Sequence, residues 1–421
     1  MAYYSLKFFY ESNKALISVA RLFDPLVLWG VTVRNRIGVS PMVQLSSEDG
    51  FATEWHLVHL GARAVGGAGL VMTEATAVEA RGRICINDLG IWRDEHVAGL
   101  AKITKFIKDE GAVPGIQLGH GGRKASYAPS FNKHGMQPLK QLTLQQGAWP
   151  VVAPSPIPFD EDSPIPVEMS HQDITAVINA YSAAAQRAVA AGFDWIEVHA
   201  AHGYLPHCFY SPISNNRTDE FGGSFENRIR FTRWIAQEVR NKIPDDKVLS
   251  FRVSHTDWID GGWTTEDTVD LASRLKSDGV DLIDVSSGGS TAKTVALMRQ
   301  MRHDEVGKQD GSKDPVADIP IAPGYQVPGA EAVRAGAKIP VAAVGLITEP
   351  EQAESIISEG RADMVMLARA LLRDPNWPIH AAIKLGETHR VRIPVQYYLA
   401  WKDFGEFHYE PVSAPTLESR E

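Results

Sequence analysis

Cysteine is scarce in this chain, whose 421 residues include only Cys85 and Cys208. Two thiols in a chain this long do not form a disulfide framework, and they cannot supply the four cysteine ligands of an iron–sulfur cluster. We therefore interpret both cysteines as packing residues, and we expect a reducing, cytoplasmic compartment.

The chain also has no long apolar run and no excess of positive charge. No stretch reaches the roughly 18 apolar residues of a membrane span, and Lys7, Glu11 and Lys14 interrupt the apolar N-terminus, which argues against a signal peptide. The formal net charge is −9, whereas nucleic-acid-binding proteins usually show a basic face. The sequence predicts a small-molecule ligand, with neither a membrane nor a nucleic acid as partner.

Short apolar runs alternate with helical patterns along the chain, which is typical of βαβ units and a parallel sheet. No Gly-x-Gly-x-x-Gly turn follows the first run, which argues against a doubly wound open sheet. The predicted fold is therefore α/β, a (β/α)₈ TIM barrel. Its expected strands are Ile37–Ser40, Gly69–Thr73, Val113–Gln117, Trp195–His199, Val248–Val253, Leu282–Ser286, Val341–Val344 and Met364–Leu367.

The barrel pattern accounts for most of the length as one domain. We expect a single barrel domain over 22–401, an N-terminal extension over 1–21 and a C-terminal tail over 402–421. Two insertions, about 121–167 and 290–326, each follow an expected strand. In a barrel both would lie over the carboxyl-terminal face and form walls of the site.

Several expected strands end in polar side chains. Gln117 and His199 end the third and fourth strands, and Arg252 lies in the fifth. Because the carboxyl ends of barrel strands meet at one face, these side chains would converge where this fold places its chemistry.

The same residues belong to a series of motifs that runs in order from about residue 22 to 401. By these motifs the chain resembles the old yellow enzyme (NADH:flavin oxidoreductase) family, in particular its thermophilic-like, xenobiotic-reductase branch. The motifs are Leu22-Phe23-Asp24-Pro25-Leu26, Ser40-Pro41-Met42, Gly90-Ile91-Trp92, Gln117-Leu118-Gly119-His120-Gly121-Gly122-Arg123-Lys124, His199-Ala200-Ala201-His202-Gly203-Tyr204-Leu205, Ser211-Pro212, Asn215 to Ser224, Val344-Gly345, Leu371 to Pro375 and Pro394 to Tyr397.

The resemblance implies that FMN binds across the barrel mouth and that NADPH or NADH reduces it. Gln117 would meet the polar edge of the flavin ring. Arg252 would lie near its N1 and C2 carbonyl, where a permanent positive charge stabilises the anionic reduced flavin. The phosphate would rest on Gly345, Ala368 and Arg369. The other implied cofactor-binding residues are Ser40, Pro41, Met42, Val43, Ala75 and Gly288.

The resemblance also assigns roles to His199, His202 and Tyr204. The two histidines would donate hydrogen bonds to a carbonyl or nitro oxygen of an electron-poor alkene, as an oxyanion hole does. Tyr204, a phenol with a pKa of about 10, would give a proton to the α-carbon. The expected activity is an FMN-dependent ene-reductase acting on α,β-unsaturated carbonyl or nitro compounds.

Two other functions stay open at this point. The same flavin site could serve an isomerase or a desaturase of a biosynthetic pathway. A metal-dependent barrel hydrolase or lyase could instead use His199, His202 and Glu197, since Glu197 lies two residues before His199 and points to the same side of the strand. The run from Asn216 to Gly223 looks structural, with Ser224 as the N-cap of the next helix.

The chain departs from the family at the wall opposite the histidines and in its tail. Val43 stands where many members of the branch have a cysteine, and Leu45 stands where a substrate-contacting tyrosine is common. We expect an altered flavin potential and more apolar substrates. Trp401 is retained as a residue that reaches the site of a neighbouring subunit, but Leu399 replaces an arginine. We expect a homodimer or a homotetramer.

Overall fold

The computed structural model describes residues 21–132, 135–136, 140–300 and 319–409. All but Arg21 of the predicted N-terminal extension lies outside the described residues, and the predicted tail is described only as far as Tyr409. Within the described part of the chain, no helix is both long and apolar enough to cross a membrane.

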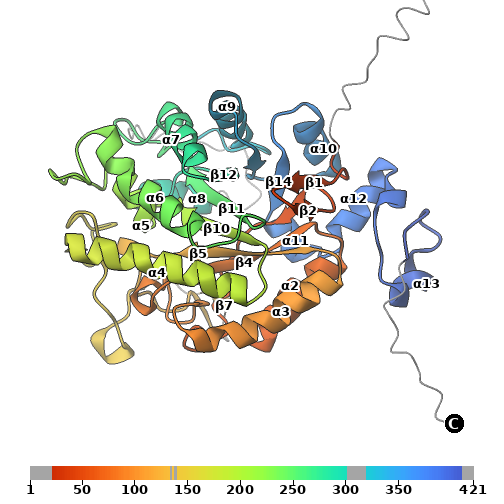
Figure 1. Ribbon diagram of the computed structural model, residues 1–421, viewed down its shortest axis with the longest axis horizontal. Helices are drawn as coiled ribbons and strands as arrows, with labels where there is room; N and C mark the ends of the chain where they lie inside the picture. The colour runs from red at the N-terminus through yellow and green to blue at the C-terminus, as the bar shows by residue number, and fades with distance from the viewer. Residues whose placement is uncertain (1–20, 133–134, 137–139, 301–318, 410–421) are drawn as a thin grey trace, which may run out of the picture.

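Eight parallel strands close into a barrel at the centre of the molecule (Figure 1). Every predicted strand is present, so the predicted fold class is confirmed. The strands are apolar because helices cover their outer faces and side chains fill the interior. Around the barrel they are β3 (Ile37–Val39), β4 (Leu70–Ala77), β5 (Val113–Gly119), β10 (Trp195–Ala200), β11 (Val248–Ser254), β12 (Leu282–Ser286), β13 (Val341–Ala343) and β14 (Met364–Leu367).

Helices surround the barrel (Figure 1). Ser224 caps its helix as predicted, because its hydroxyl accepts a hydrogen bond from the N–H of Asn227. Helix α4 begins at His171, because Ser170 is its N-cap. The surrounding helices are α2 (Glu54–Val65), α3 (Val97–Asp109), α4 (His171–Ala190), α6 (Phe225–Arg240), α7 (Thr265–Ser277), α9 (Val327–Ala337), α10 (Pro350–Ser358) and α12 (Trp377–Leu385).

An apolar plug fills the amino-terminal end of the barrel. The hairpin of β1 (Leu26–Leu28) and β2 (Val31–Val33) packs with Met72, Trp195 and Met366 in one buried cluster. This end therefore offers no polar opening among these residues, and polar groups are left to the carboxyl-terminal end, where the catalytic residues of TIM barrels lie.

The predicted insertions are anchored to each other at the carboxyl-terminal end. Arg123, in the first insertion, donates hydrogen bonds to the carbonyl oxygens of Ile157 (3.2 Å) and Ser290 (2.7 Å), and Ser290 begins the second. The part of the second insertion over 301–318 lies outside the described residues. Described elements of the insertions are η3 (Gly122–Lys124), β6 (Phe131–Asn132), β7 (Gly135–Met136), η4 (Leu144–Gln146), β8 (Val152–Ala153), β9 (Val167–Glu168) and α8 (Ala292–Gln300).

Short elements complete the chain. After the last barrel strand, the chain passes through α12 to α13 at the edge of the molecule (Figure 1). There Trp401 packs against His380 and Phe404, with ring centroids 5.5 and 6.0 Å away. The remaining elements are η1 (Ala80–Gly82), η2 (Asp94–His96), α5 (Leu205–Tyr210), α11 (Arg369–Arg373), η5 (Thr388–Arg390), η6 (Val395–Tyr397) and α13 (Tyr398–Trp401).

Candidate active site

The imidazole rings of His199 and His202 meet at the carboxyl end of β10. Nε2 of His199 lies 3.3 Å from Nδ1 of His202. The ring of Tyr204 meets the ring of His199 nearly edge-on, with 4.8 Å between centroids. His199 is also the register partner of Arg252 on β11. The three side chains predicted to act in catalysis therefore lie together at the mouth of the barrel.

The turn that carries His202 has an unusual backbone. His202 and Gly203 both adopt left-handed conformations, with φ of +59° and +74°, and a bulky residue rarely does so without support. A Cβ on Gly203 would lie 2.5 Å from the carbonyl oxygen of Gly289, and a Cβ on Gly289 would lie 2.5 Å from Cα of His202. Two stretches of backbone thus touch here, and both positions require glycine.

Hydrogen bonds hold His202 in this conformation. Its N–H donates to Oγ of Ser254 at 3.0 Å. Its carbonyl oxygen accepts from Nζ of Lys124 at 2.7 Å, and the same ammonium donates to the carbonyl of Gly289 at 2.9 Å. Lys124 therefore links the two backbone stretches, and the position of the imidazole is set from both sides.

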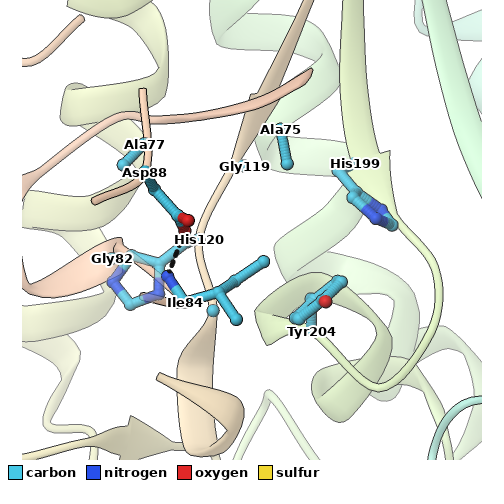
Figure 2. Close-up of a pocket in the computed structure, with 10 residues that line it drawn as sticks. Ala75, Ala77, Gly82, Ile84, Asp88, Gly119, His120, His199 and Tyr204 are labelled. Carbon is cyan, nitrogen blue, oxygen red and sulfur yellow. Dashed lines mark hydrogen bonds between the residues drawn. The ribbon is translucent and has the colours of Figure 1, made fainter. Parts of the chain in front are cut away.

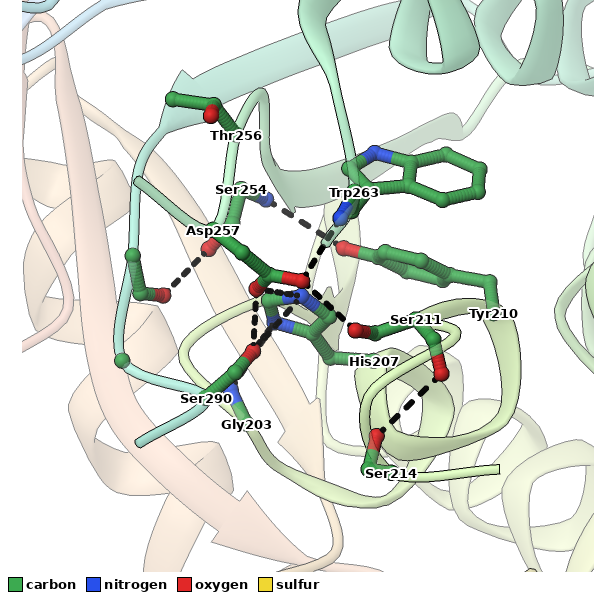
Figure 3. A network of polar contacts seen from close by, with 12 residues as sticks. Gly203, His207, Tyr210, Ser211, Ser214, Ser254, Thr256, Asp257, Trp263 and Ser290 are labelled. Carbon is green, nitrogen blue, oxygen red and sulfur yellow. Dashed lines mark hydrogen bonds and ion pairs between the residues drawn. The ribbon is translucent and has the colours of Figure 1, made fainter. Parts of the chain in front are cut away.

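A fully buried polar network lies directly behind the turn (Figure 3). Nδ1 of His207 accepts from the N–H of Gly203 at 2.9 Å, and Nε2 of His207 lies 3.0 Å from Oδ1 of Asp257. The hydroxyls of Ser290 and Ser211 both donate to the carboxylate of Asp257. Contact with His207 holds the pKa of Asp257 at about 2 despite its burial. The network ties the turn of His202 and Gly203 to the ends of β11 and β12.

The imidazoles of His199 and His202 are held in their neutral form. Burial lowers the pKa of His199 well below its usual value, and the positive charge of Arg252 lowers it further. The pKa of His202 is also lowered by burial and then by His199 and Arg252. A neutral imidazole has one N–H and one lone pair, so each ring donates from only one of its nitrogens.

Tyr204 contributes to a stack of rings and cations beside the histidines. Nζ of Lys124 lies 5.0 Å from the centroid of the Tyr204 ring and 4.6 Å from that of Phe159, which belongs to the first insertion. Phe159 thus brings the first insertion beside Lys124 and Tyr204. The ammonium of Lys124 is attracted to the ring quadrupoles of both Tyr204 and Phe159, which stabilises their packing.

A small cavity of about 10 Å³ lies between Tyr204 and the side chains of Asp88 and His120 (Figure 2). His199, Tyr204 and Ala75 line one side, and Asp88 and His120 line the other. Burial raises the pKa of Asp88 to about 8, and the charge of Glu74 contributes to this rise. One carboxylate oxygen of Asp88 has no hydrogen-bond partner among the described residues. Asp88 is therefore largely protonated at neutral pH.

The floor of the site is polar and buried. The side-chain amide of Gln117 donates to Oε1 of Glu197 at 2.8 Å, and the hydroxyl of Ser250 donates to Oε2 at 3.1 Å. Burial raises the pKa of Glu197, and the neighbouring charge of Asp284 raises it further. Glu197 therefore supports Gln117 from below, and its two oxygens are engaged by Gln117 and Ser250.

Arg252 fits the role that the resemblance implies for it. Its Nη1 donates to the hydroxyl of Ser40 at 2.8 Å and lies 3.4 Å from the carboxylate of Asp284. Its Nε is buried and has no hydrogen-bond partner among the described residues. A buried guanidinium N–H without an acceptor is costly, so this group is suited to an acceptor atom of a bound flavin.

The other implied cofactor residues lie where their strands end at the same face. Gly288 follows β12, Gly345 follows β13, and Ala368 and Arg369 follow β14. Gly345 has a φ of +122°, which favours glycine. Pro41 and Met42 are half-buried, and Ala75 is buried beside His199. These positions form a rim around the barrel mouth that fits a flat ligand with a phosphate tail.

The opposite wall is the loop after β3, which carries Val43 and Leu45. Val43 is 39% exposed, and Leu45 has a left-handed backbone with a φ of +53°. Oε2 of Glu74 accepts from the N–H of Gln44 at 2.8 Å, and Oε1 lies 3.1 Å from Nε2 of His56. The buried His56–Glu74 contact and the hydrogen bond to Gln44 thus hold the loop that carries Val43 and Leu45.

Trp401 is the predicted site residue that lies apart from the barrel mouth. The structure also does not support the alternative metal site of Glu197, His199 and His202. Trp401 lies on α13 and packs within the C-terminal segment, so the predicted contact with a neighbouring subunit is not tested. Among the described residues, the group of three ligand-type side chains whose ligand atoms lie within 4.8 Å of one another is His171, Asp219 and Glu220, at the surface. Glu197 is not part of such a group with His199 and His202.

Some residues of the site were not predicted from the sequence. Lys124, Ser286, Gln326 and Asp257 all contact the histidine turn or its supports. Lys124 was part of a quoted motif, and its place in that motif was the available signal. Asp257 and Gln326 follow loops of ordinary polar composition, and their partners are 46 and 40 residues away in the chain, so no local pattern marked them.

Comparison with known proteins agrees with this geometry. Residues 21–387 match the model of the NADH:flavin oxidoreductase / NADH oxidase family. An NADPH dehydrogenase from Geobacillus sp. (strain WCH70) is 45% identical over 383 residues, which cover 90% of this chain and 98% of the relative. An NADPH dehydrogenase from Bacillus subtilis (strain 168) is 43% identical over 383 residues, covering 90% of this chain and 99% of the relative.

The solved structure of the old yellow enzyme homologue from Zymomonas mobilis has the same fold, with a TM-score of 0.67 and 25% identity over 87% of this chain and 93% of that one. The protein is an oxidoreductase by its fold and family. The chain belongs to the NADH:flavin oxidoreductase family, that of the old yellow enzymes. This confirms the predicted family and enzyme class and overturns the alternative of a metal-dependent hydrolase or lyase.

Proposed function

We propose that this enzyme is an FMN-dependent ene-reductase that reduces the activated double bond of α,β-unsaturated carbonyl or nitro compounds. The observation that carries the proposal is the pair of neutral imidazoles, 3.3 Å apart at the barrel mouth, with Tyr204 against His199. Two converging N–H groups and a phenol suit a substrate that develops negative charge on oxygen and needs one proton on carbon.

The barrel mouth offers the groups that FMN requires. Gln117 and Arg252 would hold the ring, and Ser40, Pro41, Met42, Val43 and Ala75 would surround it. Gly288, Gly345, Ala368 and Arg369 would hold the ribityl phosphate. When bound, FMN supplies the hydride. The names of the relatives support NADPH as the electron donor.

His199 and His202 would act by binding the oxygen of the substrate. Their hydrogen bonds strengthen as charge moves onto that oxygen, so they stabilise the transition state more than the ground state. The positions of their rings are fixed before the substrate arrives by the Ser254, Lys124 and Asp257 contacts, so the rings need not move when the substrate binds.

Tyr204 would act as the acid that gives a proton to the α-carbon. Its ring is held between His199 and Lys124, which fixes the direction in which the hydroxyl points. We expect Tyr204→Phe to lower turnover by roughly 10²–10⁴-fold, the usual contribution of a positioned general acid, while flavin reduction by NADPH stays near the wild-type rate.

The first experiment is the absorbance spectrum of the purified protein, followed by NADPH consumption with 2-cyclohexenone. The proposal expects the yellow spectrum of bound flavin and turnover that depends on the enone. A colourless preparation that takes up no added FMN would falsify it.

The isomerase or desaturase alternative rests on the apolar wall of Val43 and Leu45, where the family resemblance is weakest. Stopped-flow measurement of flavin reduction distinguishes the ene-reductase from the isomerase or desaturase, and it also compares NADPH with NADH as the electron donor. Fast reduction by NADPH or NADH supports the ene-reductase, whereas slow reduction by both supports the alternative.

The expected oligomer has support in the C-terminal segment. Leu399 is 78% exposed and Phe404 is 59% exposed, and a groove of about 800 Å³ lined by His380, Tyr397 and Trp401 lies beside them. We propose that this face meets a second copy of the chain in a homodimer or homotetramer. Light scattering on the purified protein tests this, and a monomer at all concentrations would contradict it.

A further inference from the structure

A line of hydrogen-bonding groups leads from the catalytic histidines away from the substrate side. Nε2 of His202 lies 2.7 Å from Oγ of Ser286, and Oγ of Ser286 lies 3.3 Å from Oε1 of Gln326. Ser286 is 4% exposed, and Gln326 is also 4% exposed. Because water has little access to these groups, each depends on its neighbours for hydrogen bonds.

The two ends of this line have fixed roles. The N–H of Ala201 donates to Nδ1 of His199 at 3.3 Å, so neutral His199 carries its proton on Nε2, which faces His202. At the other end, Nε2 of Gln326 donates to the carbonyl of Val344 at 3.2 Å. Its Oε1 is therefore an acceptor, and it also accepts from Ser287 at 2.6 Å.

The middle of the line has two possible arrangements. In the first, Ser286 donates to Gln326 and accepts from Nε2–H of His202, and Nδ1 of His202 accepts from His199. In the second, Ser286 turns and donates to Nε2 of His202, whose proton is then on Nδ1. Gln326 keeps its hydrogen bond from Ser287, so neither arrangement leaves its oxygen unsatisfied.

Only the second arrangement presents two donors to a substrate. In the first, the N–H of His199 donates to His202, so neither that N–H nor His202 offers a donor to a substrate. In the second, Nε2–H of His199 and Nδ1–H of His202 face the same point and can be satisfied only by an oxygen atom placed between them. An oxyanion that accepts both is stabilised far better than one that accepts a single hydrogen bond.

We propose that Ser286 is a positioning residue that lets His202 change tautomer when an oxyanion ligand binds, by exchanging its hydrogen bond to Gln326 for one to His202. This inference rests on the proposed role of the histidine pair. The proton count of the ring is unchanged, because His202 loses one proton from Nε2 and gains one at Nδ1. The lowered pKa of His202, caused by burial, is consistent with a neutral ring in both states.

The test is nitrogen-15 NMR of the flavin-loaded protein labelled at histidine, without and with 4-nitrophenolate as the oxyanion probe. The chemical shifts of Nδ1 and Nε2 report directly which nitrogen carries the proton, and His202→Gln identifies the signals. We expect protonated Nε2 without the probe and protonated Nδ1 with it. The same tautomer of His202 in both samples overturns the proposal.

Two variants test the part played by Ser286. Ser286→Ala removes the donor that the second arrangement needs, so we expect 4-nitrophenolate to bind roughly tenfold to a hundredfold more weakly, the cost of losing a hydrogen bond to a charged group. Ser286→Thr keeps the hydroxyl and should restore binding to within about threefold. Equal binding by Ser286→Ala and wild type overturns the proposal.

Failure of this inference can be told apart from failure of the proposed function. If the probe binds beside the flavin and perturbs its spectrum but the tautomer of His202 does not change, the histidine site stands and the role of Ser286 is wrong. If the protein holds no flavin, the proposed function is wrong. The tautomer of His202 can still be measured in that protein, and a proton on Nδ1 without the probe would overturn the inference about Ser286.

Discussion

Two walls face each other across the barrel mouth, and they are built on the same plan. Each is a loop after a barrel strand, and each is held by a buried histidine–carboxylate pair: His207 with Asp257 behind the histidine turn, and His56 with Glu74 behind the loop of Val43. The walls differ in what they present. The first presents N–H groups and a phenol, and the second presents the apolar side chains of Val43 and Leu45.

The support beneath the two walls also differs. Asp257 accepts hydrogen bonds from Ser290, Ser211 and the backbone of Trp263 besides its contact with His207. Glu74 accepts from the backbone of Gln44 besides its contact with His56. The comparison shows that the histidine turn is held by more hydrogen bonds than the loop of Val43. The facing wall carries fewer constraints, and it includes Val43 and Leu45, the positions at which the sequence was expected to depart from the family.

The largest expected difference between the walls is in stability. Asp257→Ala leaves His207 and two hydroxyls buried without their acceptor, so it should lower the free energy of unfolding by about 3–5 kcal/mol. Glu74→Ala, the matched change on the other wall, removes fewer contacts and should cost less. Urea unfolding of both variants measures this, and an equal or larger loss for Glu74→Ala would break the comparison.

The next difference is in catalysis. His199→Ala removes one donor to the substrate oxygen and should lower kcat/KM for 2-cyclohexenone by roughly 10²–10³-fold. Leu45→Ala on the facing wall changes only apolar contact and should change the same ratio by less than about tenfold. Steady-state kinetics at matched flavin content compares the two variants. Similar losses of kcat/KM would show that both walls contribute equally to stabilising the transition state.

The cavity between Tyr204 and Asp88 makes a prediction about pH. The folded pKa of Asp88 is raised to about 8 by burial, whereas the unfolded carboxyl titrates near 3.9. Between these values the unfolded chain has lost the proton and the folded chain keeps it, so this group destabilises the fold increasingly as pH rises. Asp88→Asn, which never ionises, should therefore gain stability over wild type between about pH 4 and 8. Thermal melts at several pH values test this, and a constant difference would contradict the raised pKa.

The smallest expected effect concerns Val43. Because this side chain is 39% exposed, Val43→Cys should change the free energy of unfolding by less than about 0.5 kcal/mol. It should nevertheless shift the midpoint potential of the flavin, since it places a thiol at the cofactor rim. Spectroelectrochemical titration measures the shift, and an unchanged midpoint potential would show that the residue at position 43 does not influence the flavin potential.

The sequence was sufficient to predict the barrel, because eight buried parallel strands produce eight apolar runs. Strand ends were predicted less well. β4 continues to Ala77, four residues beyond the predicted end at Thr73, because a register shift between Met72 and Ala75 lets the strand pass the buried Glu74. A carboxylate inside a strand is rare when unpaired, and the partner His56 could not be identified from local pattern.

The candidate catalytic residues could be named from the sequence because family motifs carry them in order, but the residues that support them could not. Ser286 and Asp257 act through partners that only the closed barrel brings near, and a serine or an aspartate after a strand resembles any turn residue. The left-handed conformation of His202 was likewise invisible, since it depends on the contact between Gly203 and Gly289. The sequence thus indicates which side chains are candidates for catalysis, and the fold determines their positions and orientations.

The two thiols have a practical consequence for experiments. Cys85 and Cys208 are buried, and burial raises the pKa of Cys85 to about 11 and also raises that of Cys208. Since the thiolate is the reactive form, both should resist alkylating reagents in the native protein. A cysteine introduced at the surface, or at Val43, would then be the preferred point of attachment for a fluorophore or spin label. Movement of either wall during turnover could be followed in the otherwise unmodified enzyme.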